Sequence, residues 1–171
     1  MAAQGAVLAG EDDVARFRAA MRLVVGNVSV ITAGVGDDRS GLVVISMVSL
    51  SAQPPKVIAC VNRGSSTWPI IERFGHFGVS SLSARHQAVA ERFAGFGGVK
   101  GPDRYAGVEW ITLETGASLL KDAAAVFDCR LDEMIDRGTH SIVVGSVAAV
   151  RTSDTGEALV YWRGGYRPLH V

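Results

Sequence analysis

The stretch that decides the fold runs from Gly41 to Asn62 and reads GLVVISMVSLSAQPPKVIACVN. Its two apolar runs, Leu42–Ile45 and Val57–Val61, are rich in β-branched residues, which favours strands. Between them lies a hydroxyl-rich segment, Ser46–Ser51. The Pro54–Pro55 pair cannot donate to a sheet ladder, so strand pairing is expected to end there.

The segment Ser46–Ser51 has two interpretations. It could be an extended, neutral lining that offers hydroxyls and backbone N–H groups to a flat polar heterocycle. It could also be a plain Ser-rich turn between two strands. Taken alone, the stretch favours the second interpretation.

Composition points to a single globular domain. The chain has 171 residues, of which 48% are hydrophobic, enough for one sizeable core. Lysine and arginine together number 17, as do aspartate and glutamate, so the chain carries no net charge. It therefore has no basic excess that would indicate binding to nucleic acid or to an anionic membrane surface. We expect a flexible N-terminus over 1–10 and one domain over 11–171.

Cysteine usage and the N-terminus favour a cytoplasmic protein. Cys60 and Cys129 lie in apolar runs without a CxxC pair or a metal-ligand spacing, so we expect buried, reduced thiols and no metal. The first residues, MAAQGAVLAGEDD, lack the basic region of a signal peptide. No apolar run reaches the roughly 20 residues that span a bilayer, so no membrane partner is expected.

The order of elements predicts a mainly β protein. Helices are expected from Asp12 or Asp13 to Gly26, from Ser66 or Thr67 to Gly75, and from Ser83 to Phe93. Further strands are expected at Val28–Ala33, Phe77–Leu82, Trp110–Leu113, Ala124–Ile135, His140–Val150 and Ala158–Trp162. The turn Asp136–Gly138 predicts a hairpin. This pattern is not a regular βαβ alternation and favours an antiparallel barrel with helices outside.

Familiar catalytic motifs are absent from the sequence. It contains no GxGxxG after a strand, no GxxxxGK[ST], no HExxH and no GxSxG. Any chemistry would therefore belong to a bound cofactor. The loop Asn62–Ser66, before a predicted helix, could bind a phosphate or could be a plain capped loop.

Six ordered motifs extend over nearly the whole chain. They read FRAAMRLVVGNVSVIT, GLVVISMVSLSAQPPKVIACVNRGSST, FGVSSLSARHQAVAERFAG, DRYAGVEW, RGTHSIVVGSV and YWRGGYRPL. In this order and spacing the chain resembles the short flavin reductases of two-component flavin-dependent monooxygenases, which belong to the FMN-binding split-barrel family. The resemblance implies a six-stranded antiparallel split barrel with a few flanking helices, assembled as a homodimer with flavin near the subunit interface.

The resemblance also implies an activity. Such a protein would be an NAD(P)H:flavin oxidoreductase that reduces free flavin by hydride transfer and releases it to a separate oxygenase. The sequence does not choose FMN over FAD, or NADH over NADPH. A non-enzymatic flavin-binding module on the same fold is the alternative. An oxidase of the pyridoxamine-phosphate type is disfavoured, because no concentrated set of Arg and Lys is present.

Site residues follow from the resemblance, motif by motif. The flavin ring and ribityl chain would contact Val43, Val44, Ile45, Ser46, Met47, Val48, Ser49 and Leu50, with Asn27, Val28, Ser29 and Val30 at the other edge of the ring. The phosphate end would contact Asn62, Arg63, Ser65, Ser66 and Thr67. The site would be completed by Ser80, Ser81, Leu82, His86, Gln87, Phe93, Ala94 and Arg104. With no acidic residue in this lining, exchangeable flavin is expected.

His140 is the candidate catalytic residue. A lone histidine at the start of a strand is more often structural, but the preceding turn and the surrounding motif favour a role in orienting the nicotinamide, with Tyr166 as a neighbour. The chain departs from the family at four positions. Aliphatic Val43 and Ile45 replace hydroxyl residues, Ser80 replaces a common Asn, and Thr139 replaces the Asp that would support the histidine.

Overall fold

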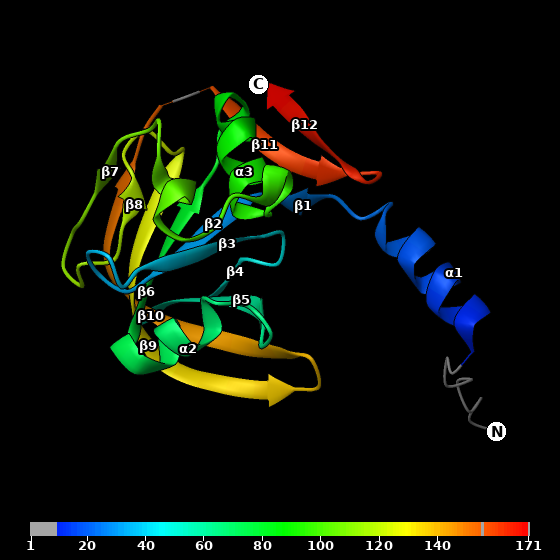
Figure 1. Ribbon diagram of the computed structural model, residues 1–171, viewed down its shortest axis with the longest axis horizontal. Helices are drawn as coiled ribbons and strands as arrows, with labels where there is room; N and C mark the ends of the chain where they lie inside the picture. The colour runs from blue at the N-terminus through cyan, green and yellow to red at the C-terminus, as the bar shows by residue number, and fades with distance from the viewer. Residues whose placement is uncertain (1–9, 155, 171) are drawn as a thin grey trace.

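The computed structural model describes residues 10–154 and 156–170, so the expected flexible segment lies outside the described residues except for Gly10. The described chain is mainly β with a few helices, as predicted (Figure 1). The helices are α1 (Glu11–Met21), α2 (Trp68–Phe74) and α3 (Gln87–Phe93), with short 3-10 turns η1 (Ala84–His86), η2 (Phe96–Gly98) and η3 (Gly101–Tyr105).

A seven-stranded antiparallel sheet forms the body of the molecule. Its strand order is β3-β2-β6-β9-β10-β5-β4. The strands are β2 (Ser29–Ala33), β3 (Ser40–Val44), β4 (Val48–Ala52), β5 (Pro55–Asn62), β6 (His76–Ser81), β9 (Ala125–Arg137) and β10 (His140–Thr152). Two smaller sheets are built from β1 (Gly26–Asn27), β11 (Glu157–Trp162) and β12 (Gly165–His170), and from β7 (Trp110–Ile111) and β8 (Leu119–Leu120).

The strand count differs from the six expected, because most of the hydroxyl-rich segment is itself a strand. β4 pairs with β5, with Val48 opposite Ile58 and Ser49 opposite Val57. The segment is therefore neither a free lining nor a plain turn. β3 and β4 occupy opposite edges of the sheet, although only Ile45–Met47 separates them in the chain.

Side chains pack into two cores, one on each face of β2. Every residue of β2 is buried. Val30 packs with Leu82 and Phe93 beneath α3, whereas Ile31 packs with Phe77 and Ile71 of α2 on the other face. Because both faces of β2 are buried, its sequence SVITA contains no charged residue and shows no alternation of apolar and exposed polar side chains.

The Phe77 ring of β6 lies against Gly145 of β10, two strands away in the same sheet. Phe77 is fully buried, and a Cβ added to Gly145 would lie 2.7 Å from Cε1 of Phe77 and 3.0 Å from Cβ of Cys129. These contacts are too short for real side chains, so only glycine fits there beside the phenyl ring. The register of β9 and β10 shifts at the same place, between Val144 and Gly145.

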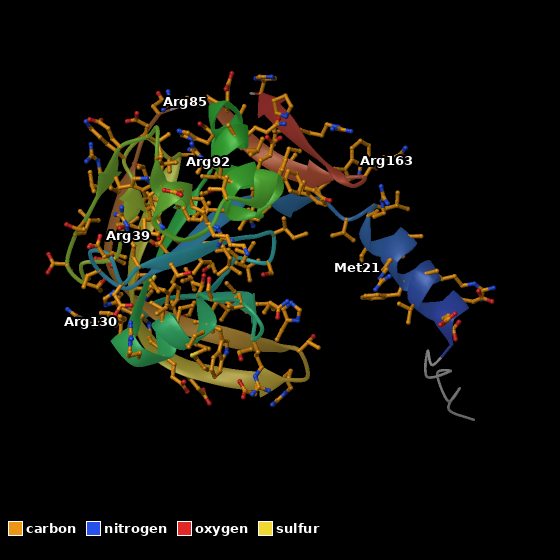
Figure 2. All side chains as sticks on the ribbon, viewed as in Figure 1. Met21, Arg39, Arg85, Arg92, Arg130 and Arg163 are labelled. Carbon is orange, nitrogen blue, oxygen red and sulfur yellow. The ribbon has the colours of Figure 1, made fainter. Side chains whose placement is uncertain are left out.

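Helix α1 stands apart from the body of the molecule (Figures 1 and 2). It ends at Met21, earlier than the Gly26 expected, and none of its residues is buried. Phe17 and Met21 remain about half exposed, at 55% and 48%. Within the described ranges, no helix has both the length and the apolar character needed to cross a bilayer.

The two cysteines differ in environment, which corrects the expectation that both are buried. Cys129 is fully buried on β9, whereas Cys60 is exposed on β5. Along β5 the residues Val57, Ala59 and Val61 face the core, so alternation turns Cys60 outward. Burial, followed by the charges of Asp128 and Asp132, raises the pKa of the Cys129 thiol to about 12.

Thiol labelling should reveal this difference. In the folded protein at pH 8, we expect a thiol reagent to modify at most one cysteine per chain, Cys60, because the raised pKa keeps Cys129 protonated. Two equivalents should react after denaturation. Since the unfolded thiol ionises near 9, stability should fall between pH 9 and 12. Rapid modification of Cys129 in the folded state would contradict its burial.

Candidate functional site

A basic cavity of about 480 Å³ lies at the start of β3. Its lining combines cations with hydroxyl groups: Asp37, Arg39, Ser40, Ser66, Ile70, Lys100, Gly101, Pro102 and Arg104. The Oγ of Ser40 lies 2.9 Å from Oγ of Ser66 and 3.0 Å from Oγ1 of the buried Thr67. The lining contains three cations and a cluster of hydroxyl groups but only one carboxylate, so the cavity is suited to bind an anion.

The two arginines of this cavity are held differently. Arg104 donates from Nη1 to the Gly41 carbonyl at 2.8 Å and from Nε to the Val99 carbonyl at 3.2 Å. The Arg39 guanidinium lies 4.1 Å from the centre of the Tyr105 ring (Figure 2 labels Arg39). Its Nε is buried, and within the described residues no hydrogen-bond acceptor serves it. Arg39 is thus a cation with unused donor capacity.

Tyr105 anchors this end of the cavity. Its hydroxyl donates to the Ser40 carbonyl at 2.8 Å, and its ring packs against Phe93 and Trp110. Burial raises the pKa of Tyr105, in opposition to the neighbouring arginines, so the phenol stays neutral. Ser40 and Arg39 are therefore fixed by aromatic packing from a distant part of the chain.

An apolar cavity of about 350 Å³ lies at the other end of β3. It is lined by Val43, Ile45, Ala94, Phe96, Tyr161 and Tyr166. The rings of Tyr161 and Tyr166 meet edge to face, with centres 5.5 Å apart. Burial raises the pKa of Tyr166, and the neighbouring Tyr161 makes a smaller contribution in the same direction. A neutral, aromatic lining of this kind suits a flat ring system.

Strand β3 sets the separation of the two cavities. Ser40 lines the basic cavity, and Ile45, just beyond the strand, lines the apolar one. Five residues of extended chain span about 16 Å, at ~3.3 Å per residue. A molecule with a flat ring at one end and an anionic group at the other could therefore lie along β3 and occupy both.

Six of the expected ligand-contacting residues line these two cavities. They are Ser66 and Arg104 in the basic cavity, and Val43, Ile45, Ala94 and Tyr166 in the apolar one. Between them, Asn27 donates from Nδ2 to the Met47 carbonyl at 2.6 Å, and Ser46 Oγ accepts from the Cys60 N–H at 3.0 Å. These two bonds fix the crossing segment between β3 and β4.

A second group of expected residues is buried within the described chain. This group comprises Val28, Ser29, Val30, Val44, Met47, Thr67, Ser80, Leu82, His86 and Phe93. Ser80 Oγ accepts from the Leu120 N–H at 3.0 Å, and His86 Nδ1 lies 3.0 Å from Ser83 Oγ. Burial lowers the pKa of His86, and the positive charge of Arg85 makes a smaller contribution in the same direction.

A third group lies elsewhere on the surface. Because β4 pairs at the far edge of the sheet, Ser49 and Leu50 line two other cavities, and Val48 is about half exposed. Gln87 bonds Glu91 on the surface of α3 at 2.8 Å. Ser81, at the end of β6, is half-buried.

The remaining expected residues gather around His140. Pairing of β10 with β5 sets His140 opposite Asn62. His140 is exposed, and its Nδ1 lies 2.9 Å from Thr139 Oγ1. Asn62 Oδ1 accepts from the Gly64 N–H at 2.8 Å, and Ser65 Oγ accepts from the Trp68 N–H at 3.3 Å. His140 lines neither cavity of β3, but the loop that follows Asn62 leads to Ser66 in the basic one.

Sequence reasoning missed several residues of the two cavities. They are Asp37, Arg39, Ser40, Ile70, Lys100, Gly101, Pro102, Phe96 and Tyr161. Arg39 and Ser40 belong to a segment that reads as a Gly- and Asp-rich turn, and Lys100 lies in a glycine-rich loop. The sequence did offer a signal for the basic cavity. It was the presence of Arg39, Lys100 and Arg104, each in a segment between apolar elements.

Comparison with known proteins identifies the class. Residues 21–170 match the family model described as a flavin reductase like domain, so the chain belongs to the flavin reductase family. The FMN reductase (NADH) RutF of Agrobacterium fabrum is 34% identical over 155 residues, which cover 90% of this chain and 87% of that protein.

Solved structures agree in fold. The flavin reductase component BorF of a bacterial two-component tryptophan halogenase superposes with a TM-score of 0.84 and 32% identity, covering 92% of this chain and 99% of that one. An NADH:FAD oxidoreductase of Streptomyces globisporus, solved with NAD and FAD fragments, gives a TM-score of 0.82 and 27% identity over 95% of this chain and 96% of that one.

The residues present fit a flavin. A flavin combines a flat, largely apolar ring with a phosphate, and the two cavities of β3 offer one partner for each. The three cations of its lining, Arg39, Lys100 and Arg104, are the observation that most favours an anionic group in the basic cavity.

Proposed function

We propose that this protein is an NADH-dependent flavin reductase that reduces FMN or FAD and supplies the reduced flavin to a separate oxygenase. The observation that carries the proposal is the pair of cavities on β3, apolar at Ile45 and basic at Ser40. The relative from Agrobacterium is named for FMN and NADH, and the Streptomyces structure for NADH and FAD. NADPH remains a second donor to be tested.

In this proposal each group of residues has one task. Arg39, Lys100 and Arg104 neutralise the phosphate, and the Ser40–Ser66 hydroxyls bond it. Val43, Phe96 and Tyr166 exclude water from one side of the ring. His140 orients the nicotinamide. When bound, the flavin would supply the hydride acceptor, and these residues would hold the two reactants next to each other.

We also propose the split-barrel form of the fold. The six strands from β3 through β2, β6, β9 and β10 to β5 are consecutive neighbours, and β3 also contacts β5. Curling of these six strands would bring the ends of the row together, with β4 as an extension beyond the closure. The high TM-score to flavin reductase structures supports this description.

Anaerobic mixing tests the activity. The protein, NADH and FMN are combined without oxygen, and the visible absorbance of the flavin is followed, with NADPH and FAD as alternative reactants. Rapid bleaching that depends on the protein is expected with NADH. Flavin binding without bleaching by either nucleotide would instead support the non-enzymatic binding module.

Assembly as a homodimer is part of the proposal. The apolar side chains of α1, among them Val14, Phe17 and Met21, remain about half exposed. A cavity of about 370 Å³ between α1 and the β11–β12 hairpin is lined by Phe17, Met21, Ile45 and Tyr161 among others. Ile45 and Tyr161 also line the proposed ring site, so a partner subunit seated here would complete that site.

Charge placed on α1 should disrupt the dimer. Phe17→Glu is expected to yield a monomer in light scattering at micromolar concentration, because burial of a carboxylate at an apolar interface is costly. Val35→Glu is the matched control, since Val35 is 44% exposed on a turn remote from α1. A wild-type monomer, or dissociation caused equally by both substitutions, would contradict this arrangement.

A further inference from the structure

A chain of hydrogen bonds ties the β9–β10 turn to the start of α2. Trp68 donates from Nε1 to Ser141 Oγ at 2.7 Å, and Ser141 Oγ donates to Asp136 Oδ1 at 2.6 Å. Ser141 is fully buried, and it stands opposite Asp136 in the ladder. The position of Ser141 is therefore determined from two sides, by an indole of α2 and by a carboxylate of β9.

Arg63 closes the same turn from the neighbouring loop. Its Nη2 lies 3.2 Å from Asp136 Oδ2, and its Nη1 donates to the Gly138 carbonyl at 3.4 Å. Its backbone N–H donates to the Thr139 carbonyl at 3.0 Å. The two carboxylate oxygens of Asp136 are thus divided, one to Ser141 and one to Arg63.

These bonds determine where His140 points. Successive side chains of a strand face opposite sides, so fixing Ser141 in the interior directs His140 outward. Thr139 Oγ1 then holds Nδ1 at 2.9 Å, and Nε2 has no partner within the described residues. Because Thr139 is neutral, the nearest carboxylate in this network is Asp136, which acts on the histidine only through the backbone.

We infer that Asp136 is a positioning residue for His140, acting through Ser141 and Arg63, and that Arg63 serves this turn and does not bind the anionic end of the flavin. Arg39, which lines the basic cavity, serves the anion in its place. The inference rests on the proposed NADH-dependent function for its effect on catalysis. Its statement about Arg63 is independent of that function.

Steady-state kinetics and flavin titration test the two statements. Asp136→Asn and Arg63→Gln are each expected to raise KM for NADH about tenfold, the equivalent of one hydrogen bond to a charged group. Flavin Kd should stay within about twofold of wild type in both. The double variant should be no worse than the poorer single variant, because both act on one network. Asp136→Glu should recover part of the loss.

Glu109→Gln is the matched control, since Glu109 forms an exposed ion pair with Lys121 at 2.6 Å, away from the turn. It should leave KM and Kd unchanged. Comparable thermal unfolding of all variants separates positioning from loss of structure. If Asp136→Asn does not fold, Arg63→Gln at its exposed position carries the test.

The opposite result is equally clear. A tenfold loss of flavin affinity in Arg63→Gln, with KM for NADH unchanged in Asp136→Asn, would overturn the inference and assign Arg63 to the flavin. If the wild-type protein does not oxidise NADH, the proposed function fails. In that case an unchanged flavin Kd in Arg63→Gln still supports the assignment of Arg63 to the turn, and a raised Kd still overturns it.

Discussion

Replacement of Phe77 by alanine should lower the free energy of unfolding by about 3–5 kcal/mol. The phenyl ring is fully buried on β6, near the centre of the seven-stranded sheet. It fills the space left by the missing side chain of Gly145, and that site cannot collapse without moving β10. Chemical denaturation monitored by circular dichroism would measure the loss.

A double-mutant cycle tests whether Phe77 and Gly145 form one packing unit. Gly145→Ala alone should cost about 1–3 kcal/mol, because the added methyl group collides with the ring. In a Phe77→Leu background the same substitution should cost less, since the shorter side chain leaves room. Equal costs in both backgrounds would contradict direct contact between the two positions.

Replacement of Arg39 by alanine should weaken FMN binding about 10- to 100-fold, the range for a lost hydrogen bond to a charged group. Arg39 forms no ion pair within the described residues, and its buried Nε has no acceptor. An anion in the basic cavity, which Arg39 lines, would be attracted by the charge of its guanidinium. Fluorescence titration of the flavin would give the affinity.

Riboflavin supplies the matched ligand control, because it carries the ring without a phosphate. Arg39→Ala should leave riboflavin affinity within about twofold of wild type. Arg130→Ala, which removes an exposed cation of β9, should affect neither ligand. Equal losses for FMN and riboflavin would show that Arg39 supports the ring site and does not contact the phosphate.

Much of the fold could be predicted where local pattern and local chemistry agree. The hairpin predicted at Asp136–Gly138 forms between β9 and β10, with Gly138 and Thr139 as the turn, and Gly138 has a positive φ of 59°. Local pattern carries no information where distant partners decide. A charged residue is rarely fully buried, yet Asp128 is fully buried and accepts a hydrogen bond from the Thr115 N–H at 2.7 Å.

The candidate site was predictable in outline, but two of the three cations of its basic cavity, Arg39 and Lys100, were not predicted. Val43, Ile45 and Ser66 lie in motifs whose order along the chain carries information. Arg39 depends on Tyr105, 66 positions later in the sequence, for the ring beneath its guanidinium. No local pattern reports such a contact, so a turn rich in glycine and aspartate conceals a cation of the site.

The strand order has a consequence for how the chain reaches its native state during synthesis. The hairpins β2–β3 and β4–β5 can each form from residues close in sequence. In the finished sheet, however, the two hairpins are separated by β6, β9 and β10. Until His140 to Ser146 have left the ribosome, β5 has no complete partner on its inner side. Because long-range pairing is slow, the unpaired edge of β5 is the surface that a nascent chain would present to chaperones.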